Sequence, residues 1–319
     1  MPSPTIAAFP RNGCIRANIA TGAELTKEGR NSGLVGSAGL WLLALEIWET
    51  ARMPHVAVGD GIELYYELYD FTPPWKAGPP PVVFVHGLGG DRRMWLFQIP
   101  VFSARYPTVV VDLRGHGLST RPTRDFTVAD MARDLLRLSR VLGIERAHWI
   151  GLSMGGVVAQ QLALDFPLVV ASLVLADTFA SLPPPAREMA QVALERMEQQ
   201  SMAEIARERI TAAFSDNVDP AMREYFIEQV AKNDYASYLR AARATFHFDA
   251  GAALSQVQKP TLVVVGEHDR VTPLPLAEDV VRRIAGARLE VIPRAGHIAN
   301  AENPEAFNRV VLEFLASVA

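Results

Sequence analysis

From residue 55 onward, short runs of apolar residues recur along the chain. The first two runs, His55–Val58 and Ile62–Tyr69, flank Gly59-Asp60-Gly61, a pattern typical of a β-hairpin. Six further runs are continuous rather than alternating, and many of their residues are β-branched. Such runs suit strands that are buried on both faces of a parallel sheet. They cover residues 82–87, 108–115, 148–151, 172–177, 261–269 and 289–293.

Segments with helical periodicity separate several of these runs. Thr127 and Asp130 are spaced as a capping box ahead of a helix that we expect to extend to residue 143. A second helix is predicted over residues 155–166, and a third begins at Asn303-Pro304, with Asn as the cap. This alternation predicts an α/β fold, doubly wound around a mostly parallel sheet with an N-terminal antiparallel hairpin.

The alternation stops between residues 179 and 253, where every periodic segment is helical. We interpret this stretch as an inserted helical lid that divides the α/β core into residues 53–178 and 254–319. Residues 1–52 do not continue the pattern, and we interpret them as a poorly ordered N-terminal extension or a non-native start. The apolar stretch 33–48 within them is shorter than the roughly 20 residues of a membrane-spanning helix. We therefore expect no membrane association, and this stretch is the only feature against that expectation.

Composition narrows the class of protein. The chain has 319 residues, of which 49% are hydrophobic, and a formal net charge of −4. No block of basic residues favours nucleic-acid binding. The single cysteine, Cys14, cannot form an internal disulfide, which is typical of a cytoplasmic protein, and no Cys/His spacing indicates a metal site. The oligomeric state does not follow from the sequence.

The segment 151–155, GLSMG, carries the strongest chemical signal. It matches the pattern G-x-S-x-G and lies between a predicted strand and a predicted helix. A turn this tight would expose the Ser153 hydroxyl at the carboxyl end of the strand, above a helix N-terminus that favours negative charge. The pattern predicts a nucleophilic serine. The alternative is a glycine-rich turn that contains a serine by chance.

A serine hydroxyl needs a base that takes its proton, and the base needs an acid that orients it. His297 follows the last predicted strand and is the candidate base. Asp269 ends the strand 261–269 at the same edge of the sheet and is the candidate acid, with Glu267 and Asp177 as alternatives. The other histidines receive packing, loop or lid roles: His55, His86, His116, His148, His247 and His268.

The glycine-rich segment 86–90, HGLGG, follows the strand at 82–85. Its glycines would let the backbone approach a substrate, and the backbone amides of Leu88 and Met154 are the candidate oxyanion hole. A phosphate-binding loop is the alternative, but the segment lacks the Lys and Ser/Thr of a P-loop.

Together these motifs resemble the α/β-hydrolase fold family over about residues 55–319. HGLGG, DLRGHGLS, GLSMGG, GEHDRVTP and AGH occur in the order of that family, as do the serine, aspartate and histidine. Within the family, the chain is most similar to the branch of 3-oxoadipate enol-lactonases and small-molecule carboxylesterases. It departs from haloalkane dehalogenases and epoxide hydrolases, which have aspartate at the position of Ser153. HGLGGD also differs from the HGxGPG of many carbon–carbon bond hydrolases.

The resemblance implies a serine hydrolase that cleaves the ester or lactone bond of a small, largely apolar substrate without a metal or organic cofactor. An enol-lactonase-like ring hydrolase, an acyltransferase, a haloperoxidase-like relative and a non-catalytic binding protein remain alternatives. The expected substrate-binding residues are Trp95, Phe179, Phe214, Tyr238 and Phe246. A lactone that carries a carboxylate would need a cation, for which the candidates are Arg92, Arg93, Arg187, Arg240 and Arg243.

Overall fold

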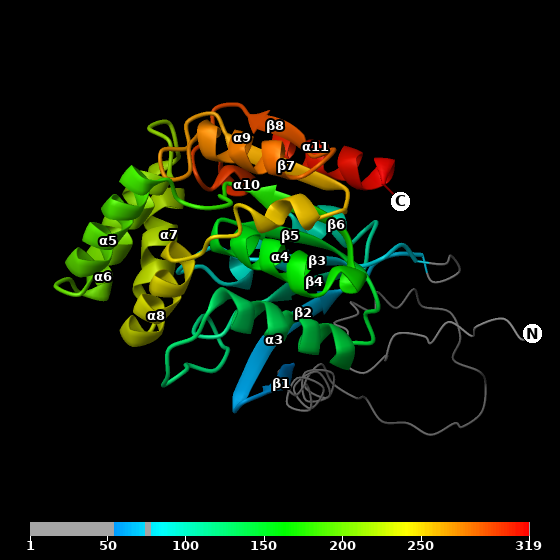
Figure 1. Cartoon of the computed structure of the whole chain (residues 1–319), viewed down its shortest axis with the longest axis horizontal. Coiled ribbons are helices and arrows are strands. Elements are labelled where there is room, and N and C mark those ends of the chain that lie inside the picture. Colours follow the sequence, from blue (N-terminus) through cyan, green and yellow to red (C-terminus); the bar gives the residue numbers. More distant parts are fainter. Residues whose placement is uncertain (1–53, 74–77, 319) are drawn as a thin grey trace, which may run out of the picture.

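The computed structural model describes residues 54–73 and 78–318, so the interpretation of residues 1–52 lies outside the described part. Eight strands form one sheet in the order β1-β2-β4-β3-β5-β6-β7-β8 (Figure 1). β1 and β2 form an antiparallel hairpin, β2 pairs antiparallel with β4, and all later pairs are parallel. The strands are β1 (His55–Gly59), β2 (Ile62–Tyr69), β3 (Val82–Val85), β4 (Thr108–Val111), β5 (Ala147–Leu152), β6 (Val170–Ala176), β7 (Thr261–Gly266) and β8 (Arg288–Ile292).

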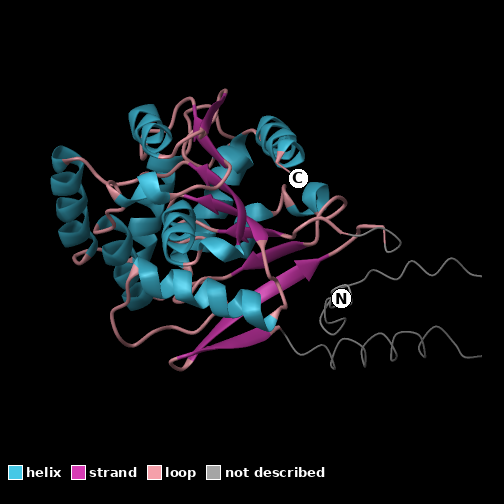
Figure 2. Cartoon of the chain, turned by 45° about the vertical axis from the view of Figure 1, so that its right-hand side comes forward, coloured by secondary structure: helices cyan, strands magenta, loops and turns pink. Residues whose placement is uncertain are grey.

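Both faces of the central strands are buried, which explains the continuous apolar runs. In β3, Val83 and Val85 pack on one face, and Val82 and Phe84 pack on the other. Figure 2 shows helices on both sides of the twisted sheet. The first face is covered by α3 (Val128–Val141), α4 (Met154–Asp165) and α9 (Leu274–Arg283), and the second by η1 (Arg92–Trp95), α2 (Ile99–Phe102), α10 (Ala299–Glu302) and α11 (Pro304–Ser317).

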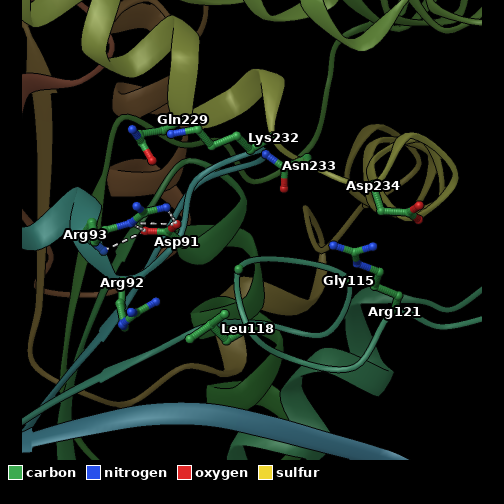
Figure 3. A pocket seen from close by; sticks show the side chains of 11 residues that line it. Asp91, Arg92, Arg93, Gly115, Leu118, Arg121, Gln229, Lys232, Asn233 and Asp234 are labelled. Carbon is green, nitrogen blue, oxygen red and sulfur yellow. Dashed lines mark hydrogen bonds and ion pairs between the residues drawn. The ribbon is translucent and has the colours of Figure 1, made fainter.

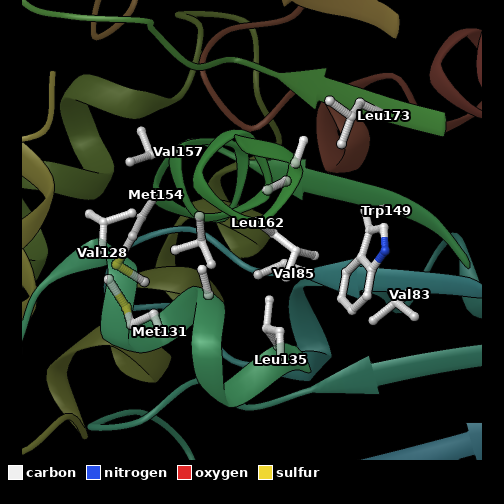
Figure 4. Close-up of a cluster of buried hydrophobic side chains, with 14 of the residues drawn as sticks. Val83, Val85, Val128, Met131, Leu135, Trp149, Met154, Val157, Leu162 and Leu173 are labelled. Atoms are coloured by element: carbon white, nitrogen blue, oxygen red, sulfur yellow. The ribbon is translucent and has the colours of Figure 1, made fainter. Parts of the chain in front are cut away.

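The core of the first face joins strands to α3 and α4. Trp149 of β5 lies beside Val83 of β3, while Met131 of α3 and Val157 of α4 close the same cluster (Figure 4). All of these side chains are almost fully buried. This packing holds β5 and α4 rigidly, and the loop between them carries Ser153.

The predicted helix starts have the expected caps. The Asp130 amide donates to the Thr127 hydroxyl at 3.2 Å, and the Thr127 amide donates to the Asp130 carboxylate at 2.9 Å, so α3 begins with the predicted capping box. The Asn303 side chain caps α11 by accepting from the Ala306 amide. The sequence pattern did not predict α9, which follows a short loop after β7.

Between β6 and β7 the chain forms four α-helices, α5 (Pro184–Met197), α6 (Met202–Ala213), α7 (Pro220–Ala231) and α8 (Tyr235–Phe246), followed by the short 3-10 helix η3 (Ala253–Gln256). We call residues 179–253 the lid. Figure 1 shows the four α-helices gathered at one end of the molecule, beside the core. Among the residues that the structure describes, no helix is both long enough and apolar enough to cross a membrane.

Candidate active site

The sheet order places the candidate site at a topological switch point. After β3 the chain moves to β4 on one side and then to β5 on the other side of β3. The loops that follow β3 and β5 therefore diverge at the carboxyl ends of neighbouring parallel strands, where open α/β sheets bind their ligands. The first loop contains Leu88, and the second contains Ser153.

Ser153 occupies a strained turn between β5 and α4. Its φ is +53°, in a region that residues with a side chain rarely adopt. The turn is possible because Gly151 and Gly155, which flank it, lie where there is no room for a side chain. A Cβ atom on Gly151 would lie 2.2 Å from the Gly155 carbonyl oxygen, and one on Gly155 would lie 2.0 Å from the Val85 carbonyl oxygen. The spacing of the motif thus has a steric cause, and it holds the serine hydroxyl above the start of α4.

Ser153, His297 and Asp269 form a chain of hydrogen bonds. His297 Nε2 lies 2.9 Å from Ser153 Oγ, and His297 Nδ1 lies 2.9 Å from Asp269 Oδ2. Because Asp269 is a carboxylate, His297 Nδ1–H donates to it and leaves Nε2 free to accept the serine proton. His297 is on the loop between β8 and α10, so three separate loops at one edge of the sheet supply the three groups.

The Asp269 carboxylate is held by more than His297. Its Oδ1 accepts from the amides of Val271 at 2.8 Å and Thr272 at 2.9 Å, and its Oδ2 accepts from the Thr272 hydroxyl at 2.7 Å. Burial by itself would raise the pKa of Asp269, but the charge and hydrogen bond of His297, together with the Thr272 donors, hold this pKa below its ordinary value. Thr272 is part of the segment GEHDRVTP that carried the family resemblance, but the sequence did not predict its hydrogen bonds to Asp269.

The two alternative acids lie elsewhere. Asp177 Oδ1 accepts from the Gly266 amide at 2.8 Å, and this carboxyl makes no hydrogen bond to His297. Burial, together with the charge of Asp269, raises the pKa of Asp177 well above its ordinary value. Glu267 is half exposed and accepts from the Arg294 amide. Of the three candidates, only Asp269 contacts the histidine.

The loop after β3 is held through its backbone. The Gly89 amide donates to His116 Nε2 at 3.2 Å, and the Gly89 carbonyl accepts from Asn233 Nδ2, in the lid, at 2.7 Å. His86 Nε2 accepts from the Leu113 amide at 2.9 Å, which fixes the start of the loop. Burial and the charge of His86 lower the pKa of His116 to about 3, so the ring stays neutral and can accept.

Of the two candidate oxyanion donors, Leu88 lines the same cavity as Ser153, and Met154 directly follows Ser153 in the chain. Among the described residues, the Leu88 amide has no backbone or side-chain acceptor, although the amides of Gly87, Gly89 and Gly90 all have one. Met154 is the first residue of α4, so its amide has no acceptor within the helix. Both amides are therefore available to an oxygen atom of a substrate.

A small cavity of about 50 Å³ lies over these groups. The core contributes Ser153, His297 and mostly apolar side chains, and the lid contributes residues from α6, α7 and α8. Tyr238 is the only one of the five expected substrate-binding residues in its wall. The wall consists of Gly87, Leu88, Met94, Leu152, Ser153, Arg209, Ile210, Ala213, Val230, Tyr238, Val271, His297 and Ile298.

The other four aromatic residues serve packing in this structure. Trp95 is fully buried, with its ring centroid 4.6 Å from that of Phe84. Phe179 lies in the core of the first sheet face. Phe214 packs edge-on against Phe226 inside the lid, at a centroid distance of 5.3 Å, and Phe246 lies under the Arg209 guanidinium. The positions of these four residues in the sequence do not show whether they pack in a core or line a pocket. That outcome depends on how the lid packs against the core.

The expected cations are also placed away from Ser153. Arg92 pairs with Glu67 and with Asp112, and Arg93 pairs with Asp91. Both line a separate polar pocket of about 160 Å³ at the junction of the core with the α7–α8 turn (Figure 3). Arg187 and Arg243 form ion pairs within the lid, with nitrogen–oxygen distances of 3.4 and 2.6 Å, and Arg240 pairs across to Asp125 of the core at 3.5 Å. The cation in the wall of the cavity that contains Ser153 and His297 is Arg209, which the sequence analysis did not single out.

Comparisons with known proteins agree with this architecture. Residues 82–310 match the profile of a family described as "Alpha/beta hydrolase family". The chain is 30% identical to 3-oxoadipate enol-lactonase 2 of Acinetobacter baylyi over 239 residues, which are 74% of this chain and 88% of the relative.

Two solved structures have the same fold. A thermophilic esterase from Thermogutta terrifontis superposes with a TM-score of 0.75 at 30% identity, covering 83% of this chain and 99% of the esterase. The enol-lactonase from Burkholderia xenovorans LB400 superposes with a TM-score of 0.75 at 26% identity, and the match covers 82% of this chain and 100% of the lactonase.

Proposed function

Because the chain belongs to the alpha/beta hydrolase family, we propose that it is a serine hydrolase that cleaves carboxylic ester or lactone bonds. The observation that carries the proposal is the hydrogen-bond chain from Ser153 Oγ through His297 to Asp269, with 2.9 Å at each step. This arrangement lets a neutral histidine take the serine proton while a buried carboxylate stabilises the imidazolium that forms.

In the first half of the reaction, Ser153 Oγ attacks the substrate carbonyl carbon and its proton passes to His297 Nε2. The amides of Leu88 and Met154 donate to the negative oxygen of the tetrahedral intermediate, and each such donor contributes roughly 3 kcal/mol to lowering the barrier. His297 then gives the proton to the alcohol oxygen as the acyl–oxygen bond breaks. An ester releases the alcohol, whereas a lactone opens and keeps it attached to the acyl group.

In the second half, His297 removes a proton from water, and the resulting hydroxide attacks the acyl-enzyme. The intermediate collapses, Ser153 Oγ regains its proton from His297, and the carboxylic acid leaves. Substrate entry requires movement of the lid, because α6, α7 and α8 contribute walls to a cavity of only about 50 Å³.

Hydrolysis of a panel of p-nitrophenyl esters and simple lactones by the full chain tests the proposal, with Ser153→Ala as the inactive variant. We expect turnover that disappears in the variant and a fluorophosphonate probe that labels wild-type protein at Ser153. Turnover that survives in Ser153→Ala would contradict the proposal.

Two alternatives have distinct signatures in the same assays. Turnover that depends on an added alcohol or thiol acceptor would indicate an acyltransferase. Ligand binding without turnover or labelling would indicate a binding protein. The similarity to two enol-lactonases favours including lactones with an unsaturated ring in the panel.

A further inference from the structure

Arg209 of α6 lines the cavity that contains Ser153 and His297. Apart from Tyr238 and the catalytic pair, the other side chains of the wall are apolar. The Arg209 guanidinium lies over the Phe246 ring, with 5.5 Å between its central carbon and the ring centroid. A half-buried arginine therefore shares a cavity wall of otherwise low polarity with Ser153 and His297.

Arg209 has no carboxylate partner within the described part of the chain. Arg223 is the other lid arginine without one, but it lies outside the cavity wall and donates to the Ser215 carbonyl at 3.2 Å. Five other lid arginines each lie within 4.0 Å of an acidic side chain: Arg187, Arg196, Arg207, Arg240 and Arg243. The nearest arginine in sequence, Arg207, pairs with Glu224 and points away to solvent, with 64% of its side chain exposed.

The electrostatic influence of Arg209 reaches the cavity wall. Burial raises the pKa of the Tyr238 phenol, and the positive charge of Arg209 and its hydrogen bond to this phenol act against that rise. A guanidinium in such a setting loses hydration when the cavity closes over a substrate, and this loss costs free energy unless an anion replaces the water. A carboxylate matches the planar donor fork of arginine and can accept two hydrogen bonds from it.

We propose that Arg209 binds a carboxylate of the substrate, so that the enzyme selects esters or lactones that carry an acid group close to the scissile carbonyl. The inference rests on the proposed hydrolase function and narrows its substrate class. The apolar remainder of the wall then binds the short carbon chain between the two groups.

The test compares matched substrates on wild-type protein, Arg209→Gln and Arg209→Lys. One pair carries the acid on the acyl part: mono-p-nitrophenyl glutarate and its neutral methyl ester. A second pair carries it on the alcohol part: 4-acetoxybenzoate and its methyl ester. Intrinsic reactivity cancels when the ratio of kcat/KM for the charged and neutral members is compared between proteins. Arg207→Gln is the control, because it removes a lid charge that faces solvent.

We expect the charged-to-neutral ratio of at least one pair to fall roughly 10- to 100-fold in Arg209→Gln, the effect of losing a charged hydrogen bond. Arg209→Lys should retain part of the preference, and Arg207→Gln should retain all of it. Turnover of the neutral esters should persist in every variant, which shows that Ser153 and the fold are intact.

Equal ratios in wild type and Arg209→Gln for both pairs, with Ser153-dependent turnover, would overturn the inference while the hydrolase function stands. Absence of all turnover and of fluorophosphonate labelling in the wild type would overturn both. Should Arg209→Gln not fold, the same ratios from Arg209→Met and Arg209→Lys decide the question.

Discussion

The backbone amide of His297 donates a hydrogen bond to the carbonyl of Ala213, the last residue of α6, at 2.7 Å. The candidate base and the lid are thus joined directly through the main chain. Because Arg209 and Ile210 of α6 also line the cavity wall, the position of this helix affects both the candidate base and the space available to a substrate.

Glu302 reinforces this joint between the lid and the histidine loop. Its Oε1 accepts from the Gly296 amide at 2.7 Å, and its Oε2 accepts from the Ser215 amide at 2.9 Å. Glu302→Gln replaces one acceptor with an amide donor, so we expect a loss of about 1–3 kcal/mol in the free energy of unfolding and a lower kcat. Urea unfolding and ester hydrolysis measure the two effects. Glu305→Gln, at an exposed position of α11, is the control, and an equal effect in both variants would contradict the prediction.

Substitution of the two neighbouring aspartates should give opposite results. Asp269→Asn removes the carboxylate that orients His297 and stabilises its charged form, so we expect kcat to fall by about 10⁴-fold. Asp177→Asn should leave kcat within the same order of magnitude, because Asp177 makes no hydrogen bond to His297 and an amide oxygen can still accept from the Gly266 amide.

Steady-state hydrolysis of one good ester measures both variants. A large loss of kcat in Asp177→Asn, with little loss in Asp269→Asn, would reverse the assignment of the acid. Unfolding curves for both variants show whether a lost activity reflects lost folding.

Acidification should destabilise the fold through His116. Its folded pKa of about 3 lies below the ordinary value of 6.5, so the unfolded chain binds a proton that the folded chain does not. The stability is therefore fully present above the ordinary pKa and is lost as the pH falls toward the folded pKa, by up to about 1.4 kcal/mol per pH unit. Buried His86 and His148, whose pKa values are also lowered, act in the same direction.

His116→Gln keeps an acceptor for the Gly89 amide and removes the titration. The variant should lose less stability than wild type between about pH 7 and about pH 5, as measured by urea unfolding. Exposed His268→Gln is the control and should follow the wild-type slope. Identical slopes for all three proteins would show that His116 does not contribute.

Asn233 should affect catalysis through the oxyanion loop. Its Nδ2 donates to the Gly89 carbonyl at 2.7 Å, across 144 positions of sequence, and so holds the peptide chain next to the Leu88 amide. Asn233→Ala should lower kcat by roughly tenfold, less than the loss of a whole oxyanion donor, with a smaller effect on KM. Lys232→Ala, at the adjacent exposed position, should leave both constants unchanged. A change in KM alone would indicate a role in binding instead.

The sequence predicted those parts of the fold and site that depend on local chemistry. Continuous apolar runs identified the buried strands, and the spacing of Thr127 and Asp130 identified the start of α3. Gly151 is required by a contact within the strand–turn–helix unit itself, whereas Gly155 is required by the approach of Val85 in the neighbouring strand β3. The motif by itself nevertheless indicated a sharp turn. The order of serine, aspartate and histidine then indicated which three loops meet.

Tertiary structure decided which side chains those loops and the lid bring together. Asp177 and Asp269 both follow strands at the same sheet edge, and only the packing of the β7 and β8 loops brings Asp269 to His297. Trp95 and Phe214 are aromatic, as pocket residues often are, yet Trp95 in η1 and Phe214 directly after α6 are both fully buried in the hydrophobic cluster of the second sheet face. The lid contains several arginines, and the sequence does not show which of them lines the cavity. The packing of α6 against the core determines that it is Arg209. These contacts join segments that are far apart in the chain, so their geometry depends on how whole helices pack. A local pattern of residues does not predict that packing.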